Sequence, residues 1–452
     1  MSSTIAPEFH LDKSVSALPR VNEGKIRPQY MQVSCQKANT GDSFALGVQE
    51  YKFTVSDNTY FVPSKTHFVL RCTLERGDGE LLGVLGATED CAPTMGMISS
   101  LFQSCEFRIG GRTVQRITQF MPQVDALLHR TTKSKPYLDS LGESSNFWSE
   151  SFAVRQREVA PGESDERSAR EFDLIYKPPL GIFHDFKHGL PSGEYSIILT
   201  PQPASQYKLG VLESKFLAGS GPVVPANDAS GYKFSVDRLE LQVAIIDGPR
   251  YDSGSFVIPL THYECQSAKI QTTSLSQHLF SVSQSTKALC VAYQDTRLAD
   301  GRCSRSKFVV LPADANSSDP LLQSNNLALA LNRLYVQFDQ IQRPSPDCDP
   351  EYIPESVDRT VQRYHESMVE ADMYENEAGC EKLAEHHRRG SFYYFNWNRS
   401  AKSGATRVQT NSQFATGTDI ANANILLFSI SENAAKITVR NGSVTNVDVV
   451  DR

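Results

Sequence analysis

Apolar and polar residues alternate along much of the chain, most clearly at its C-terminal end. The segment Thr406–Phe414 (TRVQTNSQF) alternates strictly, an aromatic run at Phe392–Trp397 precedes it, and an apolar run at Asn424–Ile430 follows it. A period of two is typical of a β-strand with one buried side. We therefore expect residues 391–450 to form several antiparallel strands and no helix.

Two dipeptides between alternating segments predict tight hairpins. Asn441-Gly442 and Gly110-Gly111 both tolerate the positive φ angles that a type I′ turn requires. In the register that a two-residue turn imposes on the second of these hairpins, Phe107 is expected to face Val114.

The same alternation recurs through the rest of the chain. Further strands are predicted at Tyr51–Val55, Phe68–Leu74, Phe172–Tyr176, Tyr195–Leu199, Leu239–Ile245, Phe256–Leu260, Leu279–Val282, Leu289–Tyr293, Phe308–Leu311 and Leu334–Phe338. The total is about sixteen strands, or about eight in each half, and eight strands in two packed sheets make one jelly roll. The sequence thus predicts an all-β fold of two consecutive eight-stranded jelly-roll β-sandwiches.

A few segments depart from this alternation. Phe120–Arg130 has helical spacing, and a second helix is expected from Val357 to about Glu370, with Ser356 as its N-cap. The apolar face of the second helix is predicted to consist of Val357, Val361, Tyr364 and Met368. Long polar stretches at Lys133–Glu166 and Ala218–Gly231 are expected to be loops.

The length of 452 residues suits two domains of roughly 200 residues each. Residues 1–30 lack periodicity, so we expect an arm that becomes ordered only against a partner. The turn Asp247-Gly-Pro-Arg indicates a boundary near residue 250. The expected domains are therefore residues 31–250 and 251–452, one jelly roll each.

Composition narrows the class of protein. The net charge of −7 argues against direct, sequence-specific binding of nucleic acid, which normally needs a basic face. The first 28 residues contain no signal-peptide core, and no run approaches the ~18 apolar residues of a membrane span. Nine scattered cysteines, none in C-x-x-C spacing, are typical of reduced thiols in a cytosolic or nuclear compartment.

Motifs for catalysis and metal binding are incomplete. The sequence contains neither G-x-S-x-G nor a phosphate-binding loop, and the zinc-helix pattern at His365-Glu366 has Val369 in place of the second histidine. His184 and His188 are four residues apart but lie between Gly181 and Gly189, where a helix is not expected. The acidic segment 347–355 lacks the glycine that a calcium loop needs. We expect no cofactor, no metal ligand and no catalytic residue, and hence no enzyme.

Two neighbouring features leave alternatives open. His386-His387-Arg388-Arg389 could contact phosphate, but an intersubunit or solvated patch of ion pairs is favoured. The aromatic run Phe392–Trp397 could form a sugar-binding platform, whereas packing against a core on one face and a neighbouring sheet or subunit on the other is favoured. Tyr394, Trp397, Arg388 and Arg389 are the predicted subunit-interface residues. A lectin-like protein and a carbohydrate-active enzyme remain the alternatives.

Three stretches resemble the double jelly-roll major capsid proteins of tailless icosahedral DNA viruses, the adenovirus-like and polinton-like lineage. They are FQSCEFRIGGRTVQRITQFMPQVDALLHR, IYKPPLGIF with LPSGEYSIILTP, and the C-terminal block from FYYFNWNRS to VRNGSV. With the order of strands, the resemblance covers most of residues 31–452.

The resemblance implies a function and partners. It implies a homotrimer that forms a pseudo-hexagonal capsomer of an icosahedral capsid, located in the virion after synthesis in the host cytoplasm or nucleus. The partners would be neighbouring capsomers, minor capsid or penton proteins and, through the N-terminal arm, an internal membrane. The family has no catalytic residues to transfer. Lys133–Glu166, Ala218–Gly231 and Asn316–Asn326 would be low surface loops or contacts between capsomers.

Overall fold

The computed structural model describes part of the chain, and the structural statements below concern that part. The described residues are 29–33, 47–76, 91–93, 97–138, 140–145, 169–201, 209–211, 232–295, 331–338, 341–344, 361–373, 383, 386, 392–397, 406–416, 418 and 420–451. The expected strand at Phe308–Leu311, the loops Ala218–Gly231 and Asn316–Asn326, Arg388, Arg389 and residues 1–28 of the expected arm lie outside these ranges.

Strands that precede residue 248 form the first sandwich of two antiparallel sheets. One sheet has the order β1 (Gln29–Val33), β11 (Tyr232–Asp247), β4 (His67–Arg76) and β8 (Ala169–Tyr176), with β3 (Thr59–Phe61) paired to β11. The other has the order β2 (Gln49–Val55), β9 (Gly193–Pro201), β6 (Phe102–Ile109) and β7 (Arg112–Ile117). A separate pair joins β5 (Cys91–Pro93) to β10 (Leu209–Val211). Strand β1 begins at Gln29, so two residues of the expected arm belong to this sandwich.

Strands that follow residue 253 form the second sandwich. One sheet has the order β12 (Gly254–Lys269), β19 (Ala423–Arg440), β14 (Thr286–Asp295) and β17 (Phe392–Asn396), with β20 (Ser443–Asp451) paired to β19. The other has the order β13 (Ser276–Ser281), β18 (Arg407–Phe414), β15 (Leu331–Phe338) and β16 (Ile341–Arg343).

The two sandwiches have the same topology. When the eight principal strands of each are numbered in chain order, leaving out β3, β5, β10 and β20, both sandwiches read 1-8-3-6 in one sheet and 2-7-4-5 in the other. Two interlocked antiparallel sheets of this kind are typical of a jelly roll. The prediction of two consecutive eight-stranded jelly rolls is confirmed, although the two halves of the sequence show no repeat.

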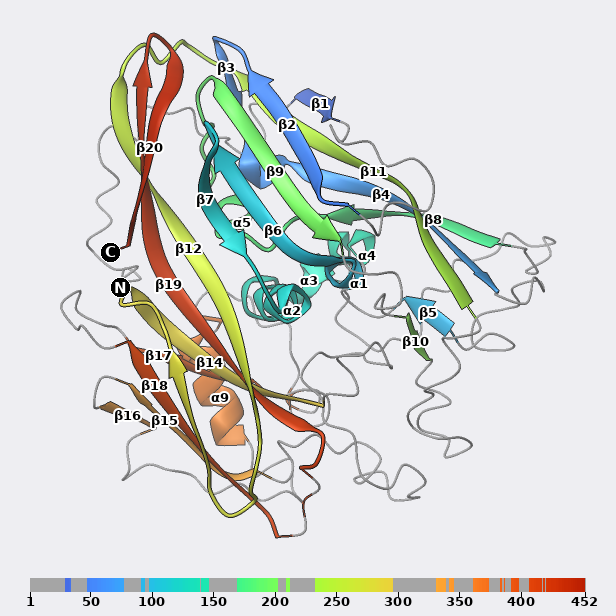
Figure 1. The fold of residues 1–452 in the computed structure, drawn as a ribbon, viewed down its shortest axis with the longest axis vertical. Coiled ribbons are helices and arrows are strands. Elements are labelled where there is room, and N and C mark those ends of the chain that lie inside the picture. The colour runs from blue at the N-terminus through green and yellow to red at the C-terminus, as the bar shows by residue number, and fades with distance from the viewer. Residues whose placement is uncertain are drawn as a thin grey trace.

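Strands β12 and β19 connect the two sandwiches. They pair without interruption from Gly254–Val439 to Lys269–Asn424, and Figure 1 shows them running beside the first sandwich and continuing into the second. Near one end Phe256 and Ile437 belong to the core of the first sandwich, and near the other end Ile425 and Leu427 belong to the core of the second. One pair of strands thus contributes to both cores.

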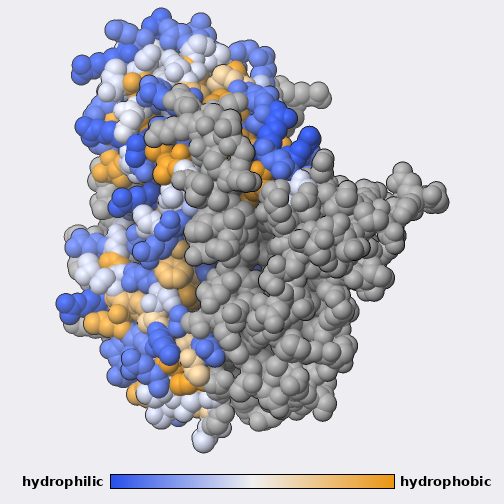
Figure 2. Space-filling view, turned by 45° about the vertical axis from the view of Figure 1, so that its right-hand side comes forward, coloured by the Kyte–Doolittle hydropathy of each residue, from blue (hydrophilic) through white to orange (hydrophobic). Residues whose placement is uncertain are grey.

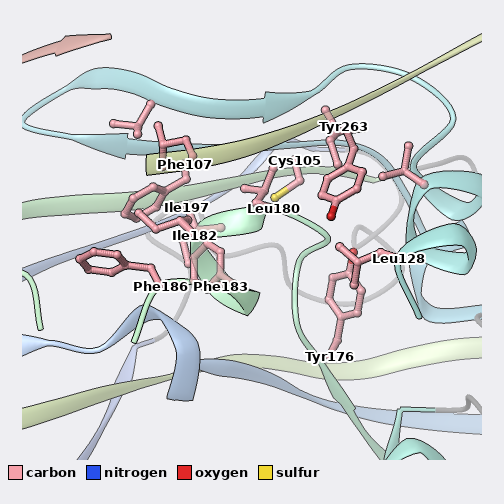
Figure 3. Close-up of a cluster of buried hydrophobic side chains, with 14 of the residues drawn as sticks. Cys105, Phe107, Leu128, Tyr176, Leu180, Ile182, Phe183, Phe186, Ile197 and Tyr263 are labelled. Carbon is pink, nitrogen blue, oxygen red and sulfur yellow. The ribbon is translucent and has the colours of Figure 1, made fainter. Parts of the chain in front are cut away.

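The first core extends across the boundary between the sandwiches. Figure 3 shows Tyr263 of β12 beside Tyr176 of β8 and Leu128 of helix α2 (Met121–Thr132), with Cys105 of β6 close by. The side chains of Tyr176, Leu128 and Cys105 are at most 3% exposed, and Tyr263 is 8% exposed. The halves are therefore joined by buried apolar surface, which contributes roughly 25 cal/mol for each Å² removed from water.

The described helices are short. They are α1 (Met97–Ser100), α2 (Met121–Thr132), α3 (Lys135–Leu138), α4 (Leu141–Ser144), α5 (Gly181–His184) and α9 (Val361–Glu370), with a 3₁₀ turn, η3, at Pro63–Lys65. Helix α2 confirms the prediction at Phe120–Arg130. None of the described helices is long and apolar enough to cross a membrane.

Two predictions about these helical segments need correction. The part of the expected loop Lys133–Glu166 that the structure describes contains α3 and α4, whose ends are stabilised by serine hydroxyls that bond to nearby carbonyls. In α9, Met368 is buried, but Val361 is 43% exposed and Arg363 and Ser367 lie on the buried side instead. The polar partners that α9 meets on β15 and β17 explain this rotation of the buried face.

The glycine hairpins form, with one change of register. Gly110 and Gly111 have φ angles of 56° and 79°, and Asn441 and Gly442 have φ angles of 52° and 84°. A bulge in β7 shifts the first hairpin, so Phe107 pairs with Gln115 and not with Val114. Because of the bulge, Val114 and Gln115 are both buried although they are adjacent in sequence.

The C-terminal strands are longer than their hydrophobic runs. The expected strands around Asn424–Ile430 and Lys436–Arg440 are one strand, β19, which continues through the polar residues Ser431–Asn433 because β12 pairs with them. No helix occurs among the described residues of 391–450, as expected.

Candidate assembly site

The contact between the two sandwiches, here called the junction, contains a buried glutamine that bonds to both. Gln115 of β7 is 3% exposed. Its Nε2 donates to the Thr261 carbonyl of β12 at 2.9 Å, and its Oε1 accepts from the Ile182 N–H of α5 at 3.0 Å. Both ends of the amide are therefore satisfied, which is what a buried polar side chain requires.

At the same place the backbones of α5 and β12 approach closely. A Cβ atom added to Gly181 would lie 2.4 Å from the Thr261 carbonyl oxygen, so only glycine fits there. The absence of a side chain at Gly181 lets α5 pack directly onto the strand that enters the second sandwich.

Helix α2 makes further contacts across the junction. Gln123 Nε2 donates to Gln294 Oε1 of β14 at 3.2 Å, and both side chains are buried. The Arg130 guanidinium carbon lies 5.0 Å from the centre of the Phe392 ring in β17, within the range of a cation–π contact.

A second set of contacts lies near the β19–β20 hairpin. The Val444 N–H donates to the Ser192 carbonyl at 2.9 Å, and the two segments form an isolated parallel bridge. Arg112 Nη1 lies 3.5 Å from Asp448 Oδ1, but both side chains are more than half exposed, so this ion pair contributes little. Hydrogen bonds and packing, more than surface charge, hold the sandwiches together.

The aromatic strand β17 is covered on both faces within the chain itself. Tyr393, Phe395 and Trp397 belong to the core of the second sandwich, where the Trp397 ring lies 5.6 Å from the Phe338 ring. Phe392 belongs to the other core and Tyr394 packs against it, partly buried. Burial raises the pKa of the Tyr394 hydroxyl well above its usual range, so this side chain stays neutral.

This placement bears on the predicted interface residues and on the lectin alternative. Trp397 is only 5% exposed, so the monomer's own core already accounts for its burial. The same burial prevents the side chains of β17 from acting as a sugar-stacking platform. Whether Tyr394 lies at a subunit interface stays a prediction, and Arg388 and Arg389 are outside the described residues.

Helix α9 covers the free edge of β17. Ser367 Oγ accepts from the Tyr394 N–H at 3.3 Å, and Glu370 Oε2 accepts from the Asn396 N–H at 2.7 Å. A cavity of about 280 Å³ lies beside this contact, lined by Arg343, Arg363, Glu366, Glu370 and the strand itself. The two arginines and two glutamates balance in charge, so the cavity has no preference for one sign of ligand.

The residues singled out by incomplete motifs do not form a catalytic or metal site in the described part of the chain. His365 and Val369 are exposed on α9. The expectation of no helix near His184 is wrong, because His184 ends the short helix α5, but His188 lies beyond that helix and the two histidines do not share a helical face. No group of three potential metal ligands occurs among the described residues. Cys72, Cys105, Cys265 and Cys290 are free and buried, and burial raises the pKa of each thiol, so thiolates are scarce.

A cluster of buried polar side chains includes Asp125 and His129 of α2. Ser99 Oγ donates to Asp125, and His129 Nδ1 lies 3.1 Å from Asp125 Oδ1. The ring of His184 is 6.4 Å from the ring of His129, and its Nε2 contacts the Pro178 carbonyl at 3.1 Å. Burial, followed by the charge of Lys133, lowers the pKa of His184 well below 6.5, so His184 is neutral at physiological pH. The serine bonds to the carboxylate and not to a histidine, which is not the arrangement of a nucleophilic triad.

The described surface is mixed in character. Figure 2 shows hydrophobic residues scattered among hydrophilic ones on the visible described face, without one continuous apolar area. The largest exposures of apolar side chains, 64% each, are at Leu141 and Leu279. Scattered apolar residues are normal on protein surfaces and do not by themselves mark a binding site.

Comparison with solved structures assigns the fold. A chain of the Sputnik virophage aligns with a TM-score of 0.56 at 10% identity, covering 94% of this chain and 89% of that one. The mavirus major capsid protein gives 0.53 at 10% identity, covering 99% and 95%, and a chain of the PBCV-1 capsid gives 0.52 at 10%, covering 94% and 97%. The fold is a double jelly roll. Nearly the whole double jelly roll is matched in each case, so the likeness includes both sandwiches and their arrangement.

Sequence comparison adds nothing to this assignment. No protein-family model matches the sequence, and no curated protein matches it either. Sequence reasoning found both sandwiches of the double jelly roll but missed the junction. Strict alternation from Val114 would place Gln115 on the solvent-facing side of its strand, but a bulge and a partner strand about 150 positions later bury it. The bulge interrupts the period of two, and the alternation in the sequence does not show it.

Proposed function

We propose that this chain is the major capsid protein of an icosahedral DNA virus and is located in the virion. The observation that carries the proposal is the pair of sandwiches with one strand order, held side by side by β12 and β19 in a single chain. Three such chains present six similar sandwiches around a threefold axis, which suits a pseudo-hexagonal building block. The structures that align over nearly the whole chain include major capsid proteins.

The proposed unit is a homotrimer of chains that each comprise an arm, residues 1–30, and two jelly rolls, residues 31–250 and 251–452. The change from one strand group to the next between Asp247 and Gly254 supports this proposed division. The proposed partners are neighbouring capsomers, minor capsid or penton proteins and, through the arm, an internal membrane. The net charge of −7 supports a shell protein that does not bind nucleic acid in a direct, sequence-specific way.

Tyr394, Trp397, Arg388 and Arg389 are proposed to lie at or next to the subunit interface. Among these residues, Tyr394 is the most informative for an experiment. It is only partly buried, it packs on the core that joins the sandwiches, and it lines the cavity beside α9.

Size-exclusion chromatography with light scattering tests the proposal. The expected mass is about 150 kDa, three times the 50.2 kDa of one chain. A monomeric mass at every concentration would contradict it. A glycan ligand bound at micromolar affinity and dependent on an exposed aromatic residue would instead favour a lectin, and glycan turnover abolished by one carboxylate substitution would favour an enzyme.

A further inference from the structure

Four basic side chains converge on one side of the first sandwich. Lys177 follows β8, and its Nζ donates to the Ser64 carbonyl in η3, next to Lys65. Helix α5 packs on η3 and ends at His184, whose Nε2 contacts the Pro178 carbonyl beside Lys177. Lys133 caps α2 one turn after His129, the ring neighbour of His184. We call Lys65, Lys133, Lys177 and His184 the lysine cluster.

The described carboxylates compensate only part of the positive charge of this cluster. Lys177 bonds to a carbonyl, Lys133 lies 5.3 Å from the Tyr137 ring, and none of the three lysines forms an ion pair with a described carboxylate. Asp185 and Asp125 are the acidic neighbours of Lys133, and Asp185 also interacts with Lys187 outside the cluster. Both carboxylates act on Lys133, whereas the charged neighbours that act on Lys177 are Lys133 and Lys65, so the positive charge is least compensated around Lys177 and Lys65.

The titration of Lys177 agrees with this arrangement. Burial, followed by the charges of Lys133 and Lys65, lowers the pKa of Lys177 to about 8. His184 is neutral for similar reasons, and its Nδ1 is buried without a hydrogen-bond partner. A bound anion would favour the protonated forms of Lys177 and His184 and would raise the pKa of each.

We propose that the lysine cluster binds a phosphate-type oxyanion. A phosphate group carries a charge of about −1.5 to −2 near neutral pH and has three acceptor oxygens, so it can contact more than one of these lysines at once. Lysine ammonium groups bind phosphate as point charges and each offers three donors. Lys177 is already held in position by η3, so little conformational freedom is lost when the anion binds. The site does not depend on trimer formation.

Thermal unfolding and isothermal titration calorimetry of the full chain with inorganic phosphate test this proposal. Ionic strength is kept constant with chloride, and Lys177→Met is compared with Lys269→Met, which replaces an exposed lysine of β12 in the second sandwich. Phosphate should raise the melting temperature of the wild type and of Lys269→Met, and Lys177→Met should bind at least ~10-fold more weakly, the loss expected for one charge-assisted contact. Lys65→Met, at an exposed position, should weaken binding with no effect on folding.

Two further measurements separate binding from a purely structural effect. In phosphate-free buffer Lys177→Met should be at least as stable as the wild type, because it removes a partly buried cation without a carboxylate partner. Near pH 8, calorimetry in buffers of different ionisation enthalpy should show proton uptake when phosphate binds to the wild type and less uptake for Lys177→Met.

The source of the phosphate is distinguished with vesicles. Lys177-dependent sedimentation with phosphatidylcholine vesicles that contain phosphatidic acid, and not with phosphatidylcholine alone, assigns a lipid headgroup. Binding of inorganic phosphate without vesicle binding assigns a soluble phosphate. An absence of any phosphate effect beyond that of chloride at equal ionic strength, or an equal effect in Lys177→Met, overturns the proposal.

Discussion

The Asn396 N–H donates a 2.7 Å hydrogen bond to Glu370 Oε2, so a side chain of α9 occupies the free edge of β17. Ser367 does the same for Tyr394 one pleat away. Strand β17 ends the order of its sheet, and exposed strand edges invite pairing with other chains. Helix α9 therefore blocks unwanted β-pairing at this edge.

Glu370→Ala should expose that edge. The Asn396 amide would lose its acceptor, and its hydrogen exchange should accelerate by ~10-fold, corresponding to about 1.4 kcal/mol for one charge-assisted bond. Glu370→Gln keeps an acceptor oxygen and should restore most of the protection. Exchange at Asn396 that is the same in all three proteins would show that α9 does not protect β17.

Gln115→Ala should weaken the junction. It leaves the Thr261 carbonyl and the Ile182 N–H without their partner, and unsatisfied buried groups cost about 1–3 kcal/mol each. We expect urea denaturation to show a free energy of unfolding lower by about 2–3 kcal/mol. Gln277→Ala, on the exposed side of β13, is the matched control and should change stability by less than about 0.5 kcal/mol. Equal effects of the two substitutions would argue against the junction as a stabilising element.

His184 should make stability depend on pH. Burial and the charge of Lys133, followed by those of His129 and Lys177, lower its pKa in the folded state well below 6.5. Below about pH 6.5 the unfolded chain takes up a proton that the folded chain does not, so the contribution of His184 to stability falls as the pH falls. His184→Gln should reduce the loss of stability between about pH 7 and about pH 5, measured by urea denaturation. A pH dependence identical to that of the wild type would refute this role.

Substitutions in β17 should affect trimer yield more than a substitution in β18. Trp397→Ala removes a buried ring and should cost about 3–5 kcal/mol, so its effect on trimer yield includes a loss of folded monomer. Tyr394→Ala removes a partly buried side chain and should lower the trimer fraction among folded chains. Gln409→Ala should change little. Chromatography of equal amounts of folded protein compares the three, and an equal loss from all would count against the predicted interface.

The alternation of side chains predicted most of the described strands because it reports directly which face is buried. Tyr51, Phe53 and Val55 are all buried, as are Leu174 and Tyr176. The turn dipeptides located both hairpins, since the φ angles at Asn441 and Gly442 are a local property. Local signals therefore predicted which segments form strands, and the number of strands predicted the fold.

Long-range contacts could not be predicted in this way. The bulge in β7 places both Val114 and Gln115 inside, where Gln115 bonds to β12. Helix α9 turns Ser367 toward the edge of β17 and leaves Val361 exposed. The lysine cluster joins residues 65, 133, 177 and 184, which become neighbours only after η3 and α5 pack. None of these relationships has a period or a spacing in the sequence.

Negative-stain electron microscopy of the purified full chain tests the central claim most directly. Triangular or hexagonal particles with six density lobes, or closed shells built from them, are the predicted result, because three double jelly rolls present six similar sandwiches. Only single two-lobed particles at every protein concentration would contradict the proposal that this chain is the building block of a capsid.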